Sequence, residues 1–82
     1  MNDRGVRSRH LGIDLGATNL KWALVERVEE SWRTVDRGHE PTLAADGPDA
    51  VIQRLIGIGR RAIAASQGPP VASIGIGVPG LY

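Results

Sequence analysis

A carboxylate, a glycine and two polar side chains follow one another at the end of an apolar run, in residues 14–19 (DLGATN). Asp14 could hold a hydrated magnesium ion, because magnesium gives up its water reluctantly and binds proteins through few carboxylates. Gly16 lets phosphate oxygens approach the backbone, and Thr18 and Asn19 supply hydroxyl and amide donors. The segment therefore predicts a hairpin that binds a nucleoside triphosphate with its magnesium. A plain turn is the alternative, since all these residue types are common in turns.

A second glycine corner lies near the other end of the sequence, at residues 75–80 (GIGVPG). It follows a segment that predicts a strand, and ligands of parallel sheets gather at the carboxyl ends of strands. Pro-Gly is a common turn dipeptide, so this corner alone is weak evidence. Two such corners separated by a helix favour one phosphate site at a single edge of a sheet.

Strand periodicity positions both corners. Residues 9–15 and 19–26 alternate between apolar and other residues, and their short link predicts an antiparallel hairpin. Residues 31–37 predict a third, more polar strand that suits an edge of the sheet. Residues 71–78 are apolar nearly throughout, which is typical of a strand covered on both faces.

A helix is expected between the third and fourth strands. Pro48 fits the first helical position, with Asp46 or Gly47 as N-cap, and a Gly-Pro-Pro segment at Gly68 ends the helix. A right-handed crossover through this helix brings the fourth strand parallel to the first. The sequence thus predicts an α/β fold of order β-β-β-α-β with a mixed sheet.

The expected helix has one apolar stripe and one polar side. Arg54, Arg60 and Arg61 belong to the polar side, and we expect them to face water. Gly57 and Gly59 each cost about 1 kcal/mol of helix stability relative to alanine. This glycine pair indicates either a close approach to the sheet or an ordinary weak point in the helix.

The composition limits the classes of function. The chain has 82 residues, a formal net charge of +1 and no cysteine, which fits one small domain and excludes a disulfide framework or a cysteine–zinc site within it. So small a charge argues against a nucleic-acid-binding surface. The apolar runs are shorter than a membrane span requires. We therefore expect a cytoplasmic protein with no nucleic-acid or membrane partner.

Both ends of the sequence also lead to expectations. Residues 1–8 are polar without periodicity, and we expect them to be a disordered leader. The sequence stops in a turn directly after a strand, which predicts the N-terminal piece of a longer protein. A complete mini-domain is the alternative, although a core of this size is thin.

The two corners carry a family resemblance. Residues 11–21 (LGIDLGATNLK) resemble the first phosphate motif of the superfamily of sugar kinases, heat-shock proteins and actin. Residues 75–80 look like the ROK branch (repressors, uncharacterised reading frames and sugar kinases), which includes bacterial glucokinases. The resemblance covers about residues 9–82. It implies a ribonuclease-H-like fold, of which these residues would be the N-terminal part of one ATPase lobe. The implied reaction transfers the γ-phosphoryl of ATP to a hydroxyl of a hexose or amino sugar.

The resemblance also assigns residues. Asp14 would be the family's magnesium-linked aspartate. The phosphate hairpin would consist of Gly16, Ala17, Thr18 and Asn19, and the second glycine turn, near the sugar, of Gly77, Pro79 and Gly80. The family often has a glycine at the position of Ala17 and a lysine at that of Asn19. Lys21 lies close by and could reach the cleft, with a solvated strand lysine as the alternative.

No catalytic residue is assigned within these 82 residues. By the resemblance, the catalytic base, the sugar ligands, the adenosine pocket and a structural zinc motif belong downstream, as does a C-terminal lobe through which the protein would form homo-oligomers. The expected partners are ATP with Mg²⁺ and a small sugar, and the piece alone is expected to be inactive. Three further aspartates, Asp36, Asp46 and Asp49, are interpreted as edge, cap and first-turn residues. The histidines, His10 and His39, are interpreted as surface residues without partners.

Three alternatives remain open. A ROK-type sugar-responsive transcriptional regulator would carry a helix-turn-helix domain first, and the residues before the first strand are too few for one. A chaperone-type ATPase would share the first corner but would have a much longer insertion before the second. A non-catalytic remnant would keep the motif without the activity.

Overall fold

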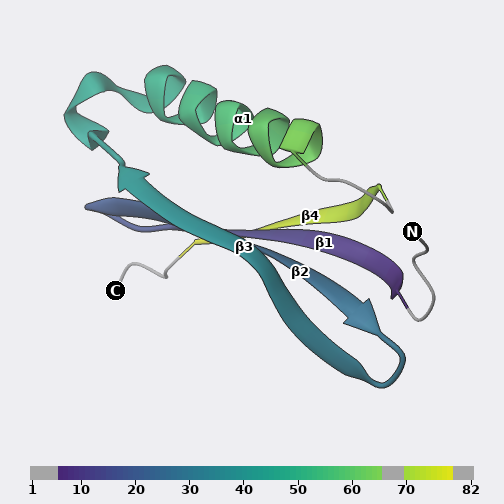
Figure 1. Cartoon of the computed structure of the whole chain (residues 1–82). Coiled ribbons are helices and arrows are strands. Elements are labelled where there is room, and N and C mark those ends of the chain that lie inside the picture. Colours follow the sequence, from purple (N-terminus) through teal and green to yellow (C-terminus); the bar gives the residue numbers. More distant parts are fainter. Residues whose placement is uncertain (1–5, 66–69, 79–82) are drawn as a thin grey trace.

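The computed structural model describes residues 6–65 and 70–78. Its elements form a four-stranded mixed sheet and one long helix (Figure 1). In chain order they are β1 (Val6–Leu15), β2 (Asn19–Val28), β3 (Ser31–Pro41), a short 3-10 turn η1 (Ala44–Asp46), α1 (Pro48–Ala65) and β4 (Val71–Gly77). The sheet order is β3-β2-β1-β4, with β1 antiparallel to β2, β2 antiparallel to β3, and β4 parallel to β1. The predicted α/β class and element order are confirmed.

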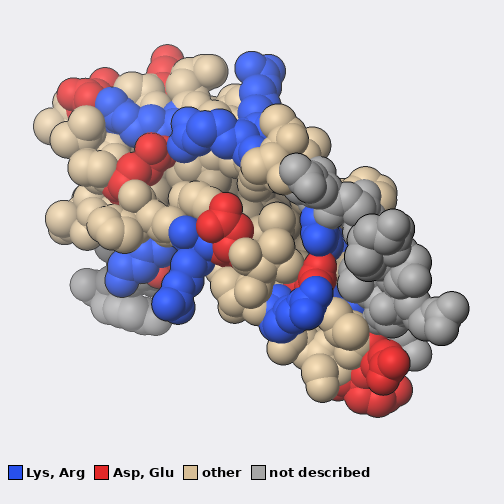
Figure 2. All heavy atoms as spheres, in the orientation of Figure 1, with Lys and Arg blue, Asp and Glu red and all other residues tan. Residues whose placement is uncertain are grey.

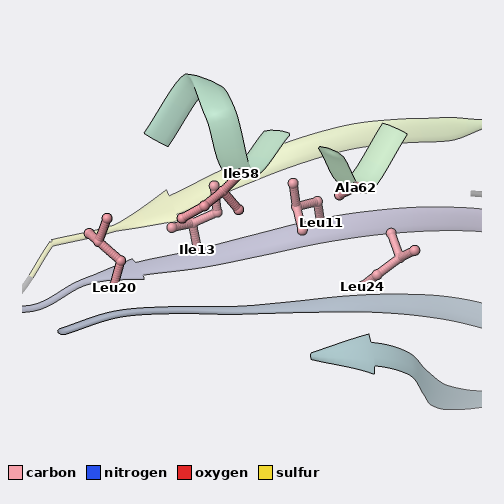
Figure 3. Packing of buried hydrophobic residues seen from close by; sticks show 6 residues of the cluster. All are labelled: Leu11, Ile13, Leu20, Leu24, Ile58 and Ala62. Carbon is pink, nitrogen blue, oxygen red and sulfur yellow. The ribbon is translucent and has the colours of Figure 1, made fainter. Parts of the chain in front are cut away.

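The sheet has two unlike faces. Helix α1 lies over one of them, and within the described residues no helix covers the other (Figure 1). The buried apolar side chains gather between α1 and the central strands, where they point toward one another (Figure 3). They are Leu11 and Ile13 of β1, Leu20 and Leu24 of β2, and Ile58 and Ala62 of α1. Below, the two sides of the sheet are called the covered face and the open face.

An ion-pair cluster extends the covered face beyond the apolar core. The Glu26 side chain is 1% exposed, and it accepts a hydrogen bond from Arg9 Nε at 2.8 Å and another from Arg33. The hydrogen bond from Arg9, then that from Arg33 and the two positive charges, hold the pKa of Glu26 below its ordinary value despite burial. Since Arg9, Glu26 and Arg33 lie on three neighbouring strands, this cluster joins β1, β2 and β3.

Two strand boundaries differ from the prediction. β1 begins at Val6, so the last residues of the predicted leader belong to the strand, because they pair with the far end of β2 up to Val28. β3 continues to Pro41, since it pairs with β2 along its whole length. The predicted edge position of β3 is confirmed.

The prediction for β4 was wrong in one respect. We expected a strand covered on both faces, and β4 is instead an edge strand whose residues after Val71 are exposed. Val71 packs against the core, whereas Ile74 and Ile76 are 46% and 52% exposed. Apolar sequence indicated a strand, but its neighbours in the described residues leave it largely uncovered.

The helix begins as predicted, with Pro48 first and the Gly47 carbonyl accepting the Val51 N–H at 3.2 Å. Asp49 lies in the first turn, which confirms its interpretation. Gly59 is buried, and a Cβ there would lie 3.8 Å from Ile74 Cδ1, so this glycine does approach the sheet. Gly57 does not, since a Cβ there would meet Arg61 of the helix itself.

Arg54 corrects the expectation that it faces water. Its guanidinium donates to the Thr42 carbonyl at 2.8 Å and forms an ion pair with Asp46. Asp46 therefore lies in η1 and holds Arg54 instead of capping α1. Arg60 and Arg61 are exposed, as expected.

No helix among the described residues is both long and apolar enough to cross a membrane.

Candidate phosphate-binding site

The sheet register brings the two predicted corners together. Asp14, near the end of β1, is the parallel partner of Gly77, the last residue of β4. On its other side Asp14 is paired with Lys21 of β2, and Lys21 is paired with His39 of β3. These four residues form one row across the sheet, next to the hairpin that joins β1 and β2. The structure thus bears out the expectation that both strand ends meet at one edge.

A second row lies two residues further from that edge. It consists of Gly75, Gly12, Ala23 and Arg37, again in direct register across β4, β1, β2 and β3. Side chains two residues apart on a strand share a face, so both rows belong to the open face. Together they line a shallow hollow of about 920 Å³.

The floor of this hollow is made of small residues that packing does not require. A Cβ at Gly12 or Gly75 would meet nothing within 4 Å, and one at Gly77 would meet only the Ile13 carbonyl at 4.0 Å. Glycine inside a strand weakens the strand and often marks a place where a ligand or another backbone approaches closely. Among the described residues, therefore, no neighbouring atom requires glycine at these three positions.

The hairpin between β1 and β2 is closed by its own backbone. The Gly16 N–H donates to the Asn19 carbonyl at 3.0 Å, and a Cβ at Gly16 would lie 2.7 Å from that oxygen. The geometry of the turn therefore requires glycine at position 16, whether or not a ligand binds there. Ala17 and Thr18 are exposed, and among the described residues neither amide N–H is donated to another group. These two N–H groups can bind an anion.

Thr42 ties this hairpin to the helix layer and was missed by sequence analysis. It is 2% exposed; its N–H donates to the Thr18 carbonyl at 2.9 Å and its hydroxyl to the Gly16 carbonyl at 2.7 Å. The Thr42 carbonyl in turn accepts from Arg54. Residue 42 is far from the hairpin in sequence, so no local pattern could have indicated this contact.

The structure describes some of the remaining predicted site residues but not all of them. Asn19 is half-buried and pairs with Pro41 of β3. Pro79 and Gly80 lie outside the described residues, so Gly77 alone represents the second glycine turn. Lys21 is exposed on the open face and lines the hollow, which fits both of its interpretations.

His10 corrects the expectation of a histidine without partners. Its Nδ1 is 2.7 Å from the Ser73 hydroxyl and its Nε2 is 2.7 Å from the Ser8 hydroxyl. The centroid of the Trp32 ring lies 5.5 Å from that of His10, and the Arg27 guanidinium lies over the Trp32 ring, 5.8 Å from its centroid. The contact between His10 and Ser73 joins β1 to β4 at the end of the sheet opposite the hairpin.

The site offers one carboxylate for a metal. Among the described residues, no three histidine, cysteine, aspartate or glutamate side chains are grouped to hold an ion directly. Asp14 is exposed and forms no ion pair with another described residue. A single free carboxylate next to backbone N–H donors suits magnesium that keeps most of its water and is shared with phosphate oxygens.

Neither a scan against protein-family models nor a search of curated proteins found a match to this chain.

Proposed function

We propose that this chain is the ATP-phosphate-binding portion of a sugar kinase, which transfers the γ-phosphoryl of ATP to a hydroxyl of a hexose or amino sugar. The proposal rests on the resemblance of the two glycine corners to the ROK branch of the sugar-kinase superfamily. It also proposes that the fold is the first part of a ribonuclease-H-like lobe. The order β-β-β-α-β with a mixed sheet is compatible with that fold.

The observation that carries the proposal is the register of Asp14 with Gly77 at the hairpin edge. Asp14 and the bare end of β4 then lie side by side on the open face, next to the hairpin that carries the Ala17 and Thr18 N–H groups. Phosphoryl transfer depends mainly on positioning and on neutralising the phosphate charge. In this proposal Asp14 contributes to neutralising that charge through the magnesium it would hold, the hairpin N–H groups contribute to positioning, and no residue of the chain is assigned as the base for the sugar hydroxyl.

Each group has a separate task in this proposal. Asp14 holds magnesium through water, and the ion neutralises charge on the phosphates when bound. The N–H groups of Ala17 and Thr18 bind phosphate oxygens, with Thr42 keeping the hairpin in place. Gly77 leaves the space beside Asp14 free of side chains. The base that accepts the sugar proton is expected from residues beyond this chain.

Calorimetric titration of the chain with ATP, with and without Mg²⁺, tests the proposal. Asp14→Asn should remove the magnesium-dependent part of binding, weakening Mg·ATP at least tenfold, because the amide has no charge to offer the hydrated ion. Asp49→Asn is the matched control, since Asp49 is an exposed carboxylate on α1. Equal Mg·ATP affinity for wild type and Asp14→Asn would contradict the proposal, as would an absence of ATP binding.

A further inference from the structure

From Asp36 to Glu40, strand β3 places its acidic and its basic residues on opposite faces of the sheet. Asp36 and Glu40 lie on the covered face, where Asp36 shares a hollow with Ile58 and Glu40 pairs with Arg61 at 3.4 Å. Arg37 and His39 alternate with them and line the hollow of the open face. The left half of Figure 2 shows acidic side chains between a basic row along α1 and a second basic group on the lower side of the molecule.

The cations of the open face, Lys21 and Arg37, differ from most arginines of the chain in lacking a carboxylate partner among the described residues. Arg9, Arg33, Arg54 and Arg61 each pair with a carboxylate. Within the described residues Lys21 and Arg37 form no such pair, although Arg37 follows Asp36 directly in sequence. Cations gathered in a concave surface raise the local concentration of anions. The hollow of the open face contains two cations that form no ion pair with a described carboxylate, and its one carboxylate, Asp14, is beside Lys21 in the sheet.

Lys21, Arg37 and His39 are placed to act on one ligand. Lys21 and His39 are direct partners across β2 and β3, about 5 Å apart at their Cα atoms, and Arg37 is two residues along β3, about 7 Å from His39. Long side chains at such distances can converge on one group. One arginine side chain can donate two parallel hydrogen bonds to two oxygens of a phosphate, and a lysine adds a positive point charge. Asp14 lies on the other side of Lys21.

We propose that Lys21, Arg37 and His39 form a binding wall for a chain of phosphate groups that extends from Asp14 across the open face toward β3. This inference deepens the proposed function and rests on it for the position of the first, magnesium-bound phosphate. It assigns a binding role to β3, which the sequence indicated only as a polar edge strand. The ligand chemistry is a linear di- or triphosphate, from either a nucleotide or an inorganic source.

The test titrates the 82-residue chain with inorganic tripolyphosphate and, separately, with ATP, each with Mg²⁺. The double variant Lys21→Ala/Arg37→Ala should bind tripolyphosphate at least tenfold more weakly than wild type, and Arg37→Lys, which keeps the charge, should lose less than Arg37→Ala. Arg60→Ala is the control, because Arg60 is an exposed arginine on α1, and its affinity should stay within twofold. Unfolding midpoints show whether each variant folds. We expect them to match wild type, because the side chains of Lys21 and Arg37 are exposed.

The outcomes separate this inference from the proposed function. Loss of Mg·ATP binding in Asp14→Asn, with unchanged affinity in the double variant, would overturn the phosphate wall and leave the proposed function standing. Tripolyphosphate binding that the double variant loses, without any binding of ATP, would support the wall and contradict the nucleotide assignment. If the wild-type chain does not bind tripolyphosphate, the wall is wrong.

Discussion

The covered and open faces of the sheet are built from the same strands and yet differ in every property that matters for function. On β1, Leu11 and Ile13 are buried against α1, while their neighbours Gly12 and Asp14 are exposed on the other side. On the covered face the arginines have carboxylate partners, and on the open face Lys21 and Arg37 have none among the described residues.

Under the proposed function, this difference divides stability and ligand binding between the two faces of one small sheet. A period of two sends alternate residues to opposite faces, so one strand can supply a core and a site without compromise at any single position. The covered face is filled and paired. The open face keeps glycines and free charges that add little to folding. Substitutions on the two faces should therefore have opposite consequences, and the following experiments test that contrast.

Leu11→Ala should have the largest effect. Leu11 is 1% exposed at the centre of the core, and removing such a side chain costs about 3 kcal/mol of unfolding free energy through lost burial and the cavity left behind. Urea unfolding followed by circular dichroism measures the loss. A cost below about 1 kcal/mol would mean that the covered face is not the main source of stability.

Glu26→Gln should come next, at about 2 kcal/mol near neutral pH. The substitution removes the negative charge that faces Arg9, whose side chain is 12% exposed, and the cost is below that of a fully buried pair because Arg33 is 66% exposed. The pKa of Glu26 is lower in the folded chain than its ordinary value of 4.5. The ionised side chain therefore stabilises the fold fully at pH values above 4.5, and this stabilisation is lost as the pH falls through the lowered pKa.

The difference between wild type and Glu26→Gln should therefore narrow in acid. Urea midpoints of both proteins, measured from neutral pH to well below 4.5, provide the check. A difference that stays constant over this range would show that the charge of Glu26 contributes nothing to stability. Glu30→Gln, at an exposed turn position, is the control.

Thr42→Val should have a smaller effect on stability, about 1 kcal/mol, because it removes the hydroxyl hydrogen bond to the Gly16 carbonyl and keeps the side-chain volume. Its main consequence should be local: faster hydrogen exchange at the amides of Gly16 and Thr42, whose N–H groups are donated to the Asn19 and Thr18 carbonyls. Thr42→Ser retains the hydroxyl and should restore slow exchange. Unchanged exchange in Thr42→Val would contradict the role of Thr42 in holding the hairpin.

Gly12→Ala should have the smallest effect on folding, within about 0.5 kcal/mol, because the added methyl group meets nothing within 4 Å. The same methyl group stands on the floor of the hollow and should weaken tripolyphosphate binding several-fold. Calorimetry and urea unfolding of one variant measure both quantities. A large loss of stability, or an unchanged affinity, would break the contrast between the faces.

Local patterns in the sequence predicted much of this architecture. Alternation placed β1 and β2, a more polar segment after a charged turn placed β3, and the Gly47-Pro48 step placed the start of α1. The acid and glycine of the hairpin predicted a phosphate site at this end of the sheet, which stays a prediction, and the register confirmed that β1 and β4 end side by side there. Sequence patterns were less informative for β4, since apolar residues indicate a strand but not whether its neighbours cover it.

What the sequence determined by itself is local: which residues form strands or helix, and which strand ends carry a carboxylate and glycines. These follow from the periodicity and backbone preferences of neighbouring residues. Tertiary structure alone decided the rows across the sheet, the anchoring of the hairpin by Thr42, and the partners of Glu26 and Arg54. Each depends on register and packing between segments far apart in the chain, whose contacts are set by burial and pairing over the whole sheet and leave no trace in a local pattern.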